Sequence, residues 1–402
     1  MSETAYVIGA GINKIMKNKD GLSPPKIDDM FQIALKMKKY EEPMYSQELE
    51  EVYEYIKHYW KHDKTFLSAH PFNLEELLSL LDLQYRDGIK ENDESKCRKI
   101  SQIFNKVTRL LGDILSEFWH DDFLESPMRV FGQILYKDKS VIITFNYDTF
   151  IERSIEYASM LKDAIPFTFR GGMETPSFAE LAYSYWNWNR ALAYCVNFNE
   201  VVLHQPGIRR YVEGSSFYAH PQNKMYDEVD ECYILKLHGS LNWFYYLPIS
   251  RIPSLSDEPK PTFPEEKKDH TIVSSEDEWT FRSNPYVGEW FVAPIIVPPV
   301  VSKLEYVNQG IYQKALQPVW DKAKQVLSNC KRLVVIGYSF PTSDFLTMQL
   351  FLEAFSENNL AELIVVSPDP SVVQKVKRLC HFDKDVVAYK DLGELVANLE
   401  IT

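Results

Sequence analysis

Short apolar runs, rich in valine and isoleucine, recur along this chain and are bounded by Gly, Asn, Asp or Pro. Near-continuous runs of this kind are typical of strands buried on both faces, as in the parallel sheets of α/β proteins. The runs are YVIGA at 6–10, VIITF at 141–145, YILKL at 233–237, LVVIG at 333–337, LIVV at 363–366 and VVA at 386–388. Helical patterns separate several of them. The sequence therefore predicts an α/β fold, with a Rossmann-like parallel sheet flanked by helices.

A long segment with helical periodicity separates the first two runs. Asn73 and Glu76 form a capping pair around leucines at helical spacing, and a second amphipathic stretch follows. An ordinary crossover between parallel strands needs only about a dozen residues. We therefore interpret residues 28–135 as a helical insertion after the first strand, with residues 1–27 and 136–402 forming the Rossmann-like core.

Nine of the 22 prolines fall between Pro248 and Pro299, together with the charged sequence DEPKPTFPEEKKD. Because proline cannot donate a hydrogen bond to a neighbouring strand, we expect residues 248–299 to be a loop-rich excursion without a central strand. From Leu304 to Thr402 helical and strand patterns alternate again. The sheet is thus expected to be built from both ends of the chain.

The charge and cysteine content restrict the partners. The sequence has 44 basic and 57 acidic residues, a net charge of -13, so its field repels phosphate backbones and anionic membranes, and we expect neither as a direct partner. Five scattered cysteines without a paired motif fit a reducing compartment, and no signal peptide or long apolar span is found, which predicts a cytoplasmic protein. His58 and His62 are better interpreted as a solvated helix face than as metal ligands, and no metal is expected.

The turn after the first run has the sequence Gly9-Ala10-Gly11-Ile12-Asn13. Two glycines allow the backbone to approach a pyrophosphate, and a following helix N-terminus would stabilise its charge. Lys14 occupies the place of the third glycine in the full dinucleotide-binding fingerprint. Close packing of the strand against its helix explains the glycines equally well.

Polar or small residues follow four other runs. Asn146 and Asp148 end the second, and His238 and Gly239 end the third. Taken singly, Asp148 is a good N-cap for the next helix and a lone histidine is more often structural than catalytic. The remaining candidates follow the fourth and fifth runs and are Gly337, Ser339, Asp344 and Ser367. Because parallel strands end at one edge of a sheet, we expect a nucleotide-sized crevice there.

Five motifs occur in a characteristic order: GAG at 9–11, TFNYD at 144–148, LKLHGSLNW at 235–243, APIIVPP at 293–299 and GYSFPTSD at 337–344. In this order they resemble the sirtuin-like domains of bacterial antiphage defence proteins, the branch of the sirtuin family that destroys NAD+. The resemblance implies that Asn146 and His238 are the catalytic pair and that Asp148 lies near the nicotinamide. The residues implied to contact the rest of the dinucleotide are Gly9, Ala10, Gly11, Ile12, Asn13, Gly239, Gly337, Ser339, Asp344 and Ser367.

The resemblance implies an NAD+ hydrolase that takes NAD+ as its substrate and releases nicotinamide and ADP-ribose. Neutral His238 would accept a proton from water or a ribose hydroxyl, and Asn146 would hold that group with its donor and acceptor. The paired zinc-binding cysteines of deacylating sirtuins are missing, so an acyl-lysine groove is not expected. Related stand-alone chains form homo-oligomers and assemble with a HerA-type ATPase, and the same is expected here.

Two other functions compete with this hypothesis. Ser339, Asp369 and His381 follow the chain order of a serine hydrolase triad, although Pro341 replaces the second glycine of the nucleophile elbow. A non-catalytic nucleotide sensor or scaffold would use the same glycines only for binding. Release of nicotinamide from NAD+ distinguishes the hydrolase from both.

Overall fold

The computed structural model describes most of the chain. The described residues are 3–18, 20–38, 43–116, 118, 127–162, 192–196, 200–205, 208–213, 232–248, 272–275, 286–287, 290–297, 310–342, 344–358 and 360–399. Every structural statement below concerns these residues.

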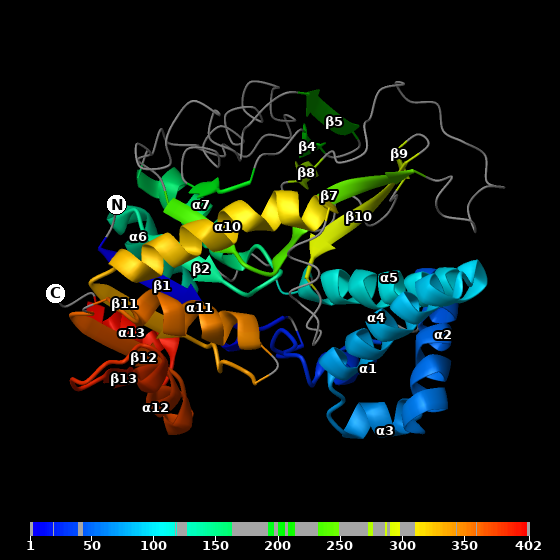
Figure 1. The fold of residues 1–402 in the computed structure, drawn as a ribbon, viewed down its shortest axis with the longest axis horizontal. Helices are drawn as coiled ribbons and strands as arrows, with labels where there is room; N and C mark the ends of the chain where they lie inside the picture. Colours follow the sequence, from blue (N-terminus) through cyan, green and yellow to red (C-terminus); the bar gives the residue numbers. More distant parts are fainter. Residues whose placement is uncertain are drawn as a thin grey trace.

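A seven-stranded sheet in the order β13-β12-β11-β1-β2-β6-β3 forms the centre of the molecule (Figure 1). Its strands are β1 (Thr4–Ile8), β2 (Val141–Thr144), β3 (Leu192–Tyr194), β6 (Cys232–Lys236), β11 (Arg332–Ile336), β12 (Glu362–Val366) and β13 (Val387–Tyr389). All neighbouring pairs are parallel. The predicted α/β fold is confirmed, and each predicted run forms a strand of this sheet.

The central strands are mostly apolar because helices cover both faces of the sheet. Residues 5–8 of β1 and 333–336 of β11 are all buried. The covering helices are α6 (Pro127–Asp138), α7 (Phe150–Lys162), α10 (Gly310–Asn329), α11 (Phe345–Phe355), α12 (Pro370–Leu379) and α13 (Leu392–Leu399). Among them α6 packs against α7 and α13, while α11 packs against α10 and α12. The predicted alternation of helix and strand toward the C-terminus is confirmed.

The order of strand addition reverses beside β1. The chain passes from β1 to β2 and then β6 on one side, and later returns with β11 on the other side of β1 before adding β12 and β13. In open parallel sheets, ligands bind beyond the carboxyl ends of the strands at such a reversal. The loops that follow β1 and β11 therefore lie where a ligand is expected.

Helices do follow the first strand, as predicted. They are α1 (Met30–Lys36), α2 (Pro43–Trp60), α3 (Lys64–Ala69), α4 (Leu74–Glu91) and α5 (Glu94–Ser116), which lie together beside the sheet (Figure 1). Asn73 is the N-cap of α4 as predicted, but its Oδ1 accepts a hydrogen bond from the Glu75 N–H at 2.8 Å and not from the predicted partner Glu76. The predicted boundary at residue 135 falls inside α6, whose Phe131 packs edge-on against Tyr6 of β1 with ring centroids 5.7 Å apart.

A second sheet, in the order β5-β4-β8-β7-β10-β9, was not predicted. Its strands are β4 (Glu200–Gln205), β5 (Ile208–Glu213), β7 (Gly239–Pro248), β8 (Ile272–Ser275), β9 (Tyr286–Val287) and β10 (Trp290–Ile296). The expectation that residues 248–299 hold no central strand was wrong, because β8 and β10 each pair on both sides. The strand β10 tolerates Pro294 because the pairing with β7 shifts register between Pro294 and Ile295.

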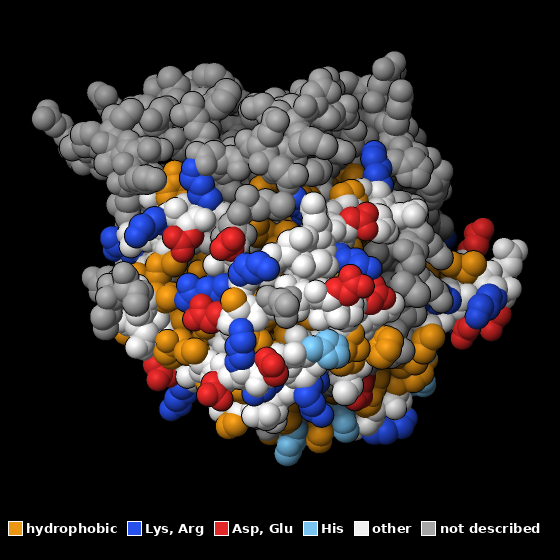
Figure 2. All heavy atoms as spheres, turned by 60° about the vertical axis from the view of Figure 1, so that its left-hand side comes forward, with side chains coloured by type: hydrophobic (Ala, Val, Ile, Leu, Met, Phe, Trp, Pro, Cys, Tyr) orange, Lys and Arg blue, Asp and Glu red, His pale blue; other side chains and the backbone are white. Residues whose placement is uncertain are grey.

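The surface carries charges of both signs. On the face drawn in Figure 2, lysine and arginine side chains are interspersed with aspartate and glutamate. The described residues of that face form no continuous basic track along which a phosphate backbone would bind. None of the helices in the described part of the chain combines the length and apolarity needed to cross a bilayer.

Candidate active site

The glycines after β1 allow two loops of the sheet to meet. A Cβ atom on Gly9 or on Gly11 would lie 2.7 Å from the carbonyl oxygen of Gly337, in the loop after β11. The Gly9 N–H donates to the Ile336 carbonyl and the Gly11 N–H to the Gly337 carbonyl, each at 2.9 Å. Close packing therefore explains both glycines. Because these two N–H groups already donate to carbonyls, a phosphate at this turn would be held by other atoms.

Gly337→Ala is expected to destabilise the fold more than Gly21→Ala. Both glycines have positive φ, +62° and +74°, so both substitutions carry the left-handed cost of about 1–2 kcal/mol. A Cβ on Gly337 would also lie 2.4 Å from the Ile12 nitrogen, whereas nothing lies within 4 Å at Gly21. The overlap adds about 1–3 kcal/mol at Gly337. Urea denaturation measures the free energy of unfolding of both variants. Equal losses of stability would contradict the explanation that Gly337 is needed for the close approach of the two loops.

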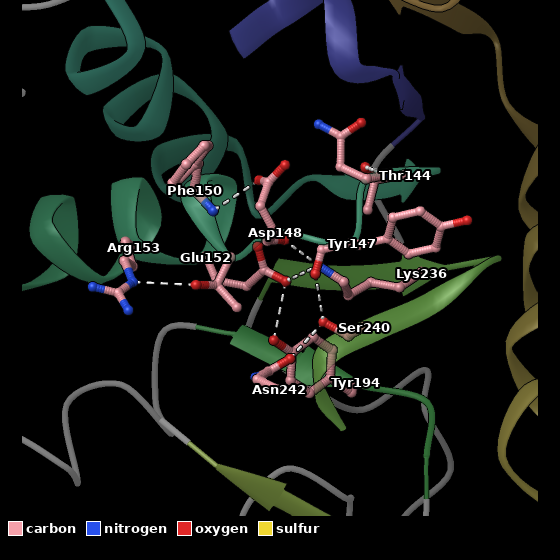
Figure 3. Close-up of polar contacts among 12 residues, drawn as sticks. Thr144, Tyr147, Asp148, Phe150, Glu152, Arg153, Tyr194, Lys236, Ser240 and Asn242 are labelled. Atoms are coloured by element: carbon pink, nitrogen blue, oxygen red, sulfur yellow. Dashed lines mark hydrogen bonds and ion pairs between the residues drawn. The ribbon is translucent and has the colours of Figure 1, made fainter. Parts of the chain in front are cut away.

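Asn13 and Asp148 join the loops that follow β1 and β2. Asn13 Nδ2 donates to Asp148 Oδ2 at 2.8 Å, and both residues are buried. Asp148 Oδ1 also accepts a hydrogen bond from the Phe150 N–H at 3.1 Å, at the start of α7 (Figure 3). Asp148 therefore binds the start of α7, but it lies one residue before the N-cap position, where the Thr149 carbonyl accepts the Arg153 N–H. The same carboxylate therefore binds the first N–H of α7 and holds the side-chain amide of Asn13.

A buried ion pair that the sequence did not predict supports this loop from β6. Lys236 Nζ donates to Glu152 Oε1 at 2.8 Å and to the Asp148 carbonyl at 2.5 Å, and both charged side chains are only 1% exposed. Tyr194 donates its hydroxyl to the same glutamate oxygen at 3.0 Å (Figure 3). The one sequence signal was a lysine inside the apolar run YILKL. The network fixes the backbone at Asp148.

His238 and Asp344 join the loops after β6 and β11. His238 Nε2 lies 3.3 Å from Asp344 Oδ2, and both side chains are buried. Tyr338 donates its hydroxyl to the same carboxylate oxygen. The Phe145 ring, after β2, stacks on Tyr338 at 3.8 Å and meets the imidazole edge-on at 5.2 Å. The ends of β2, β6 and β11 therefore form one cluster, as the sequence predicted for the sheet edge.

Asn146 lies in the loop after β2, between two aromatic residues that contact His238. Its neighbours Phe145 and Tyr147 both have rings near His238, with centroid distances of 5.2 and 6.4 Å. The Asn146 side chain is buried, and neither its Nδ2 nor its Oδ1 has a hydrogen-bond partner in the described part of the chain. An unsatisfied buried polar group costs about 1–3 kcal/mol. We therefore expect a ligand or a water molecule to form hydrogen bonds with the Asn146 amide.

Strand β10 holds His238 in place through the backbone. Val297, just after β10, donates its N–H to the His238 carbonyl at 2.8 Å, and its own carbonyl accepts the Tyr147 hydroxyl at 2.7 Å. Gly239 has φ +76°, and a Cβ there would lie 2.0 Å from the Ile295 carbonyl oxygen. The motifs HGS and APIIVPP are therefore adjacent, and Gly239 is explained by this close approach.

The two tyrosines of the cluster stay neutral. Burial raises the pKa of Tyr147 and of Tyr338 far above the ordinary value, and the nearby Asp344 charge raises both further. Each hydroxyl is therefore a hydrogen-bond donor over the physiological range. Neither tyrosine can act as a general base.

Three other predicted site residues are less buried than this cluster. Ala10 and Ser339 are exposed, and Ser367 is half-buried with its N–H bonded to the Tyr389 carbonyl at 2.9 Å. The serine hydrolase triad is not assembled, because Asp369 caps the N-terminus of α12 while His381 follows its C-terminus, about 15 Å away for a ten-residue helix.

No family model and no curated protein matches the sequence. In the part of the chain that the structure describes, no group of three or more His, Cys, Asp or Glu side chains is arranged to hold a metal ion. The functional interpretation therefore depends on the geometry of the cluster and on the motifs that form it.

Proposed function

We propose that this chain is an NAD+ hydrolase that cleaves the N-glycosidic bond between nicotinamide and ribose. The observation that carries the proposal is the buried, unpartnered amide of Asn146, which follows β2 at the carboxyl edge of a parallel sheet, between two residues whose rings lie near His238. An amide offers both donor and acceptor, which matches a ribose hydroxyl or an attacking water molecule. The motifs that form this edge are also those that resemble sirtuin-like NAD+-destroying domains.

The reaction needs few groups. As the glycosidic bond breaks, its electron pair leaves with nicotinamide and positive charge develops at the anomeric carbon. The buried carboxylate of Asp148 stabilises that charge. Water held by Asn146 adds to the anomeric carbon and gives its proton to neutral His238, which yields ADP-ribose.

Asn13 supports the nicotinamide end of this site. Its Oδ1 is buried and has no hydrogen-bond partner among the described residues, while its Nδ2 is held by Asp148. A fixed, unused acceptor suits the N–H of a carboxamide. We assign the exposed and half-buried strand ends, Ser339 and Ser367 among them, to the adenosine side of the dinucleotide.

The same resemblance supports a role in antiphage defence. An enzyme that depletes NAD+ harms its own cell unless it is held inactive, so its activity would be controlled by assembly. We therefore include in the proposal a cytoplasmic homo-oligomer that assembles with a HerA-type ATPase.

Incubation of the purified chain with NAD+, alone and with the ATPase, tests the proposal. We expect nicotinamide and ADP-ribose to appear in equal amounts, measured by chromatography, in at least one of the two mixtures. NAD+ that binds but is recovered intact from both would contradict hydrolysis and would indicate the nucleotide sensor instead. Failure of NAD+ to bind in either mixture would exclude both.

A further inference from the structure

The Asp344 carboxylate is directed away from the helix that it begins. Asp344 precedes α11 at the N-cap position, where aspartate usually accepts a hydrogen bond from the first turn, but its side chain makes no capping bond. It lies 1% exposed, next to Tyr338 and His238. From the resemblance, Asp344 was expected to contact the dinucleotide. The geometry assigns it to the imidazole.

The loop before α11 holds this orientation. Phe340 is fully buried and adopts the left-handed region with φ +51°, which is uncommon for a bulky residue. Lys375 of α12 donates to the Phe340 carbonyl, and the Asp344 N–H donates to the Pro341 carbonyl at 2.9 Å. Tyr338 donates to the Asp344 carboxylate from the other end of the same loop. The carboxylate is therefore fixed from both ends of a strained loop.

From this geometry we infer that Asp344 is a positioning residue that orients the imidazole of His238 and sets its protonation. In the tautomer that donates from Nε2 to the carboxylate, Nδ1 carries no proton and is the acceptor of the ring. The contact of 3.3 Å is at ion-pair distance without hydrogen-bond alignment. Contacts between catalytic groups are often loose before substrate binds and tighten afterwards. The role in the reaction rests on the proposed function, whereas the role in protonation does not.

Asp344 brings a negative charge to ion-pair distance of the His238 imidazole. Tyr338 and Tyr147, from the loops after β11 and β2, are neutral phenols, and Phe145 carries no charge. The charge of Glu75, at the start of α4, raises the pKa of both tyrosines, and the charge of Asp344 raises it more. An anion beside an imidazole favours its protonated form. Removal of the Asp344 charge is thus expected to move proton uptake by His238 to lower pH.

The direct test is an NMR titration of histidine-labelled protein, with the His238 signal assigned by its loss in His238→Gln. In Asp344→Asn we expect the midpoint of the His238 titration to fall by about one pH unit or more. Glu357→Gln removes an equal charge from an exposed position after the same helix and is expected to leave the midpoint unchanged. An unchanged midpoint in a folded Asp344→Asn protein would overturn the inference. This result does not depend on whether NAD+ is cleaved.

Kinetics test the role in the reaction. Because neutral His238 is the base, the acidic limb of the kcat profile is expected to move to lower pH in Asp344→Asn. The maximal kcat is expected to fall about 10²-fold, with KM nearly unchanged, because the imidazole is no longer held in its productive orientation. A rise in KM with kcat unchanged would instead indicate a direct binding role for Asp344 and would contradict positioning.

Discussion

Alanine at position 146 is expected to abolish NAD+ cleavage while leaving the melting temperature unchanged or higher. The Asn146 amide has no protein partner in the described residues, so its removal relieves a desolvation cost of about 1–3 kcal/mol while leaving a small cavity. Loss of the group that holds water or ribose is expected to lower kcat about 10²- to 10⁴-fold. His238→Ala is expected to lose as much activity. Nicotinamide release and thermal unfolding are the two measurements.

A second asparagine provides the matched control. Asn358 Nδ2 donates to the Leu327 carbonyl at 2.7 Å and to the Cys330 carbonyl at 3.1 Å, away from the site. Asn358→Ala is therefore expected to lose about 1 kcal/mol of stability and to keep its activity. His58→Ala, on an exposed helix face, controls for histidine removal. A marked loss of stability in Asn146→Ala would mean that the amide is structural, contrary to the account.

Lys236→Met is expected to destabilise the fold by about 3–5 kcal/mol, the largest effect on stability among these predictions. The substitution leaves the Glu152 carboxylate buried without its cation, and an uncompensated buried charge is costly. The double variant Lys236→Met with Glu152→Leu is expected to recover most of the loss, because apolar side chains can replace a buried pair. Chemical denaturation measures each free energy of unfolding.

An exposed ion pair serves as the comparison. Lys324 and Glu353 lie 2.6 Å apart with side chains 53% and 44% exposed. Lys324→Met is expected to change stability by less than about 1 kcal/mol, because solvent screens the pair. If Lys236→Met cost no more than Lys324→Met, the buried network would not be what fixes the loop at Asp148.

The sequence predicted the central sheet because strands buried on both faces leave continuous apolar runs. It also predicted that polar strand ends would gather at one edge, as the contacts Asn13–Asp148 and His238–Asp344 confirm. Which side chains would pair with each other could not be predicted. Lys236 and Glu152 pair across 84 positions, and no local pattern marks such a contact.

The second sheet was missed for a local reason. Proline argues against a central strand, but the register shift beside Pro294 removes the need for its missing N–H. From the resemblance, Asp344 was expected to contact the dinucleotide, and no local pattern marks its contact with His238. The unpartnered state of the Asn146 amide is a property of the packed cluster, so it could be found only from the structure.

The position of NAD+ bound to the inactive His238→Ala protein tests the account most directly. A structure of that complex is predicted to show the nicotinamide riboside at the carboxyl edge of β2 and β6, with the Asn146 amide hydrogen-bonded to the ribose or to a water beside the anomeric carbon. NAD+ seated elsewhere, with the Asn146 amide still unpartnered, would contradict the account.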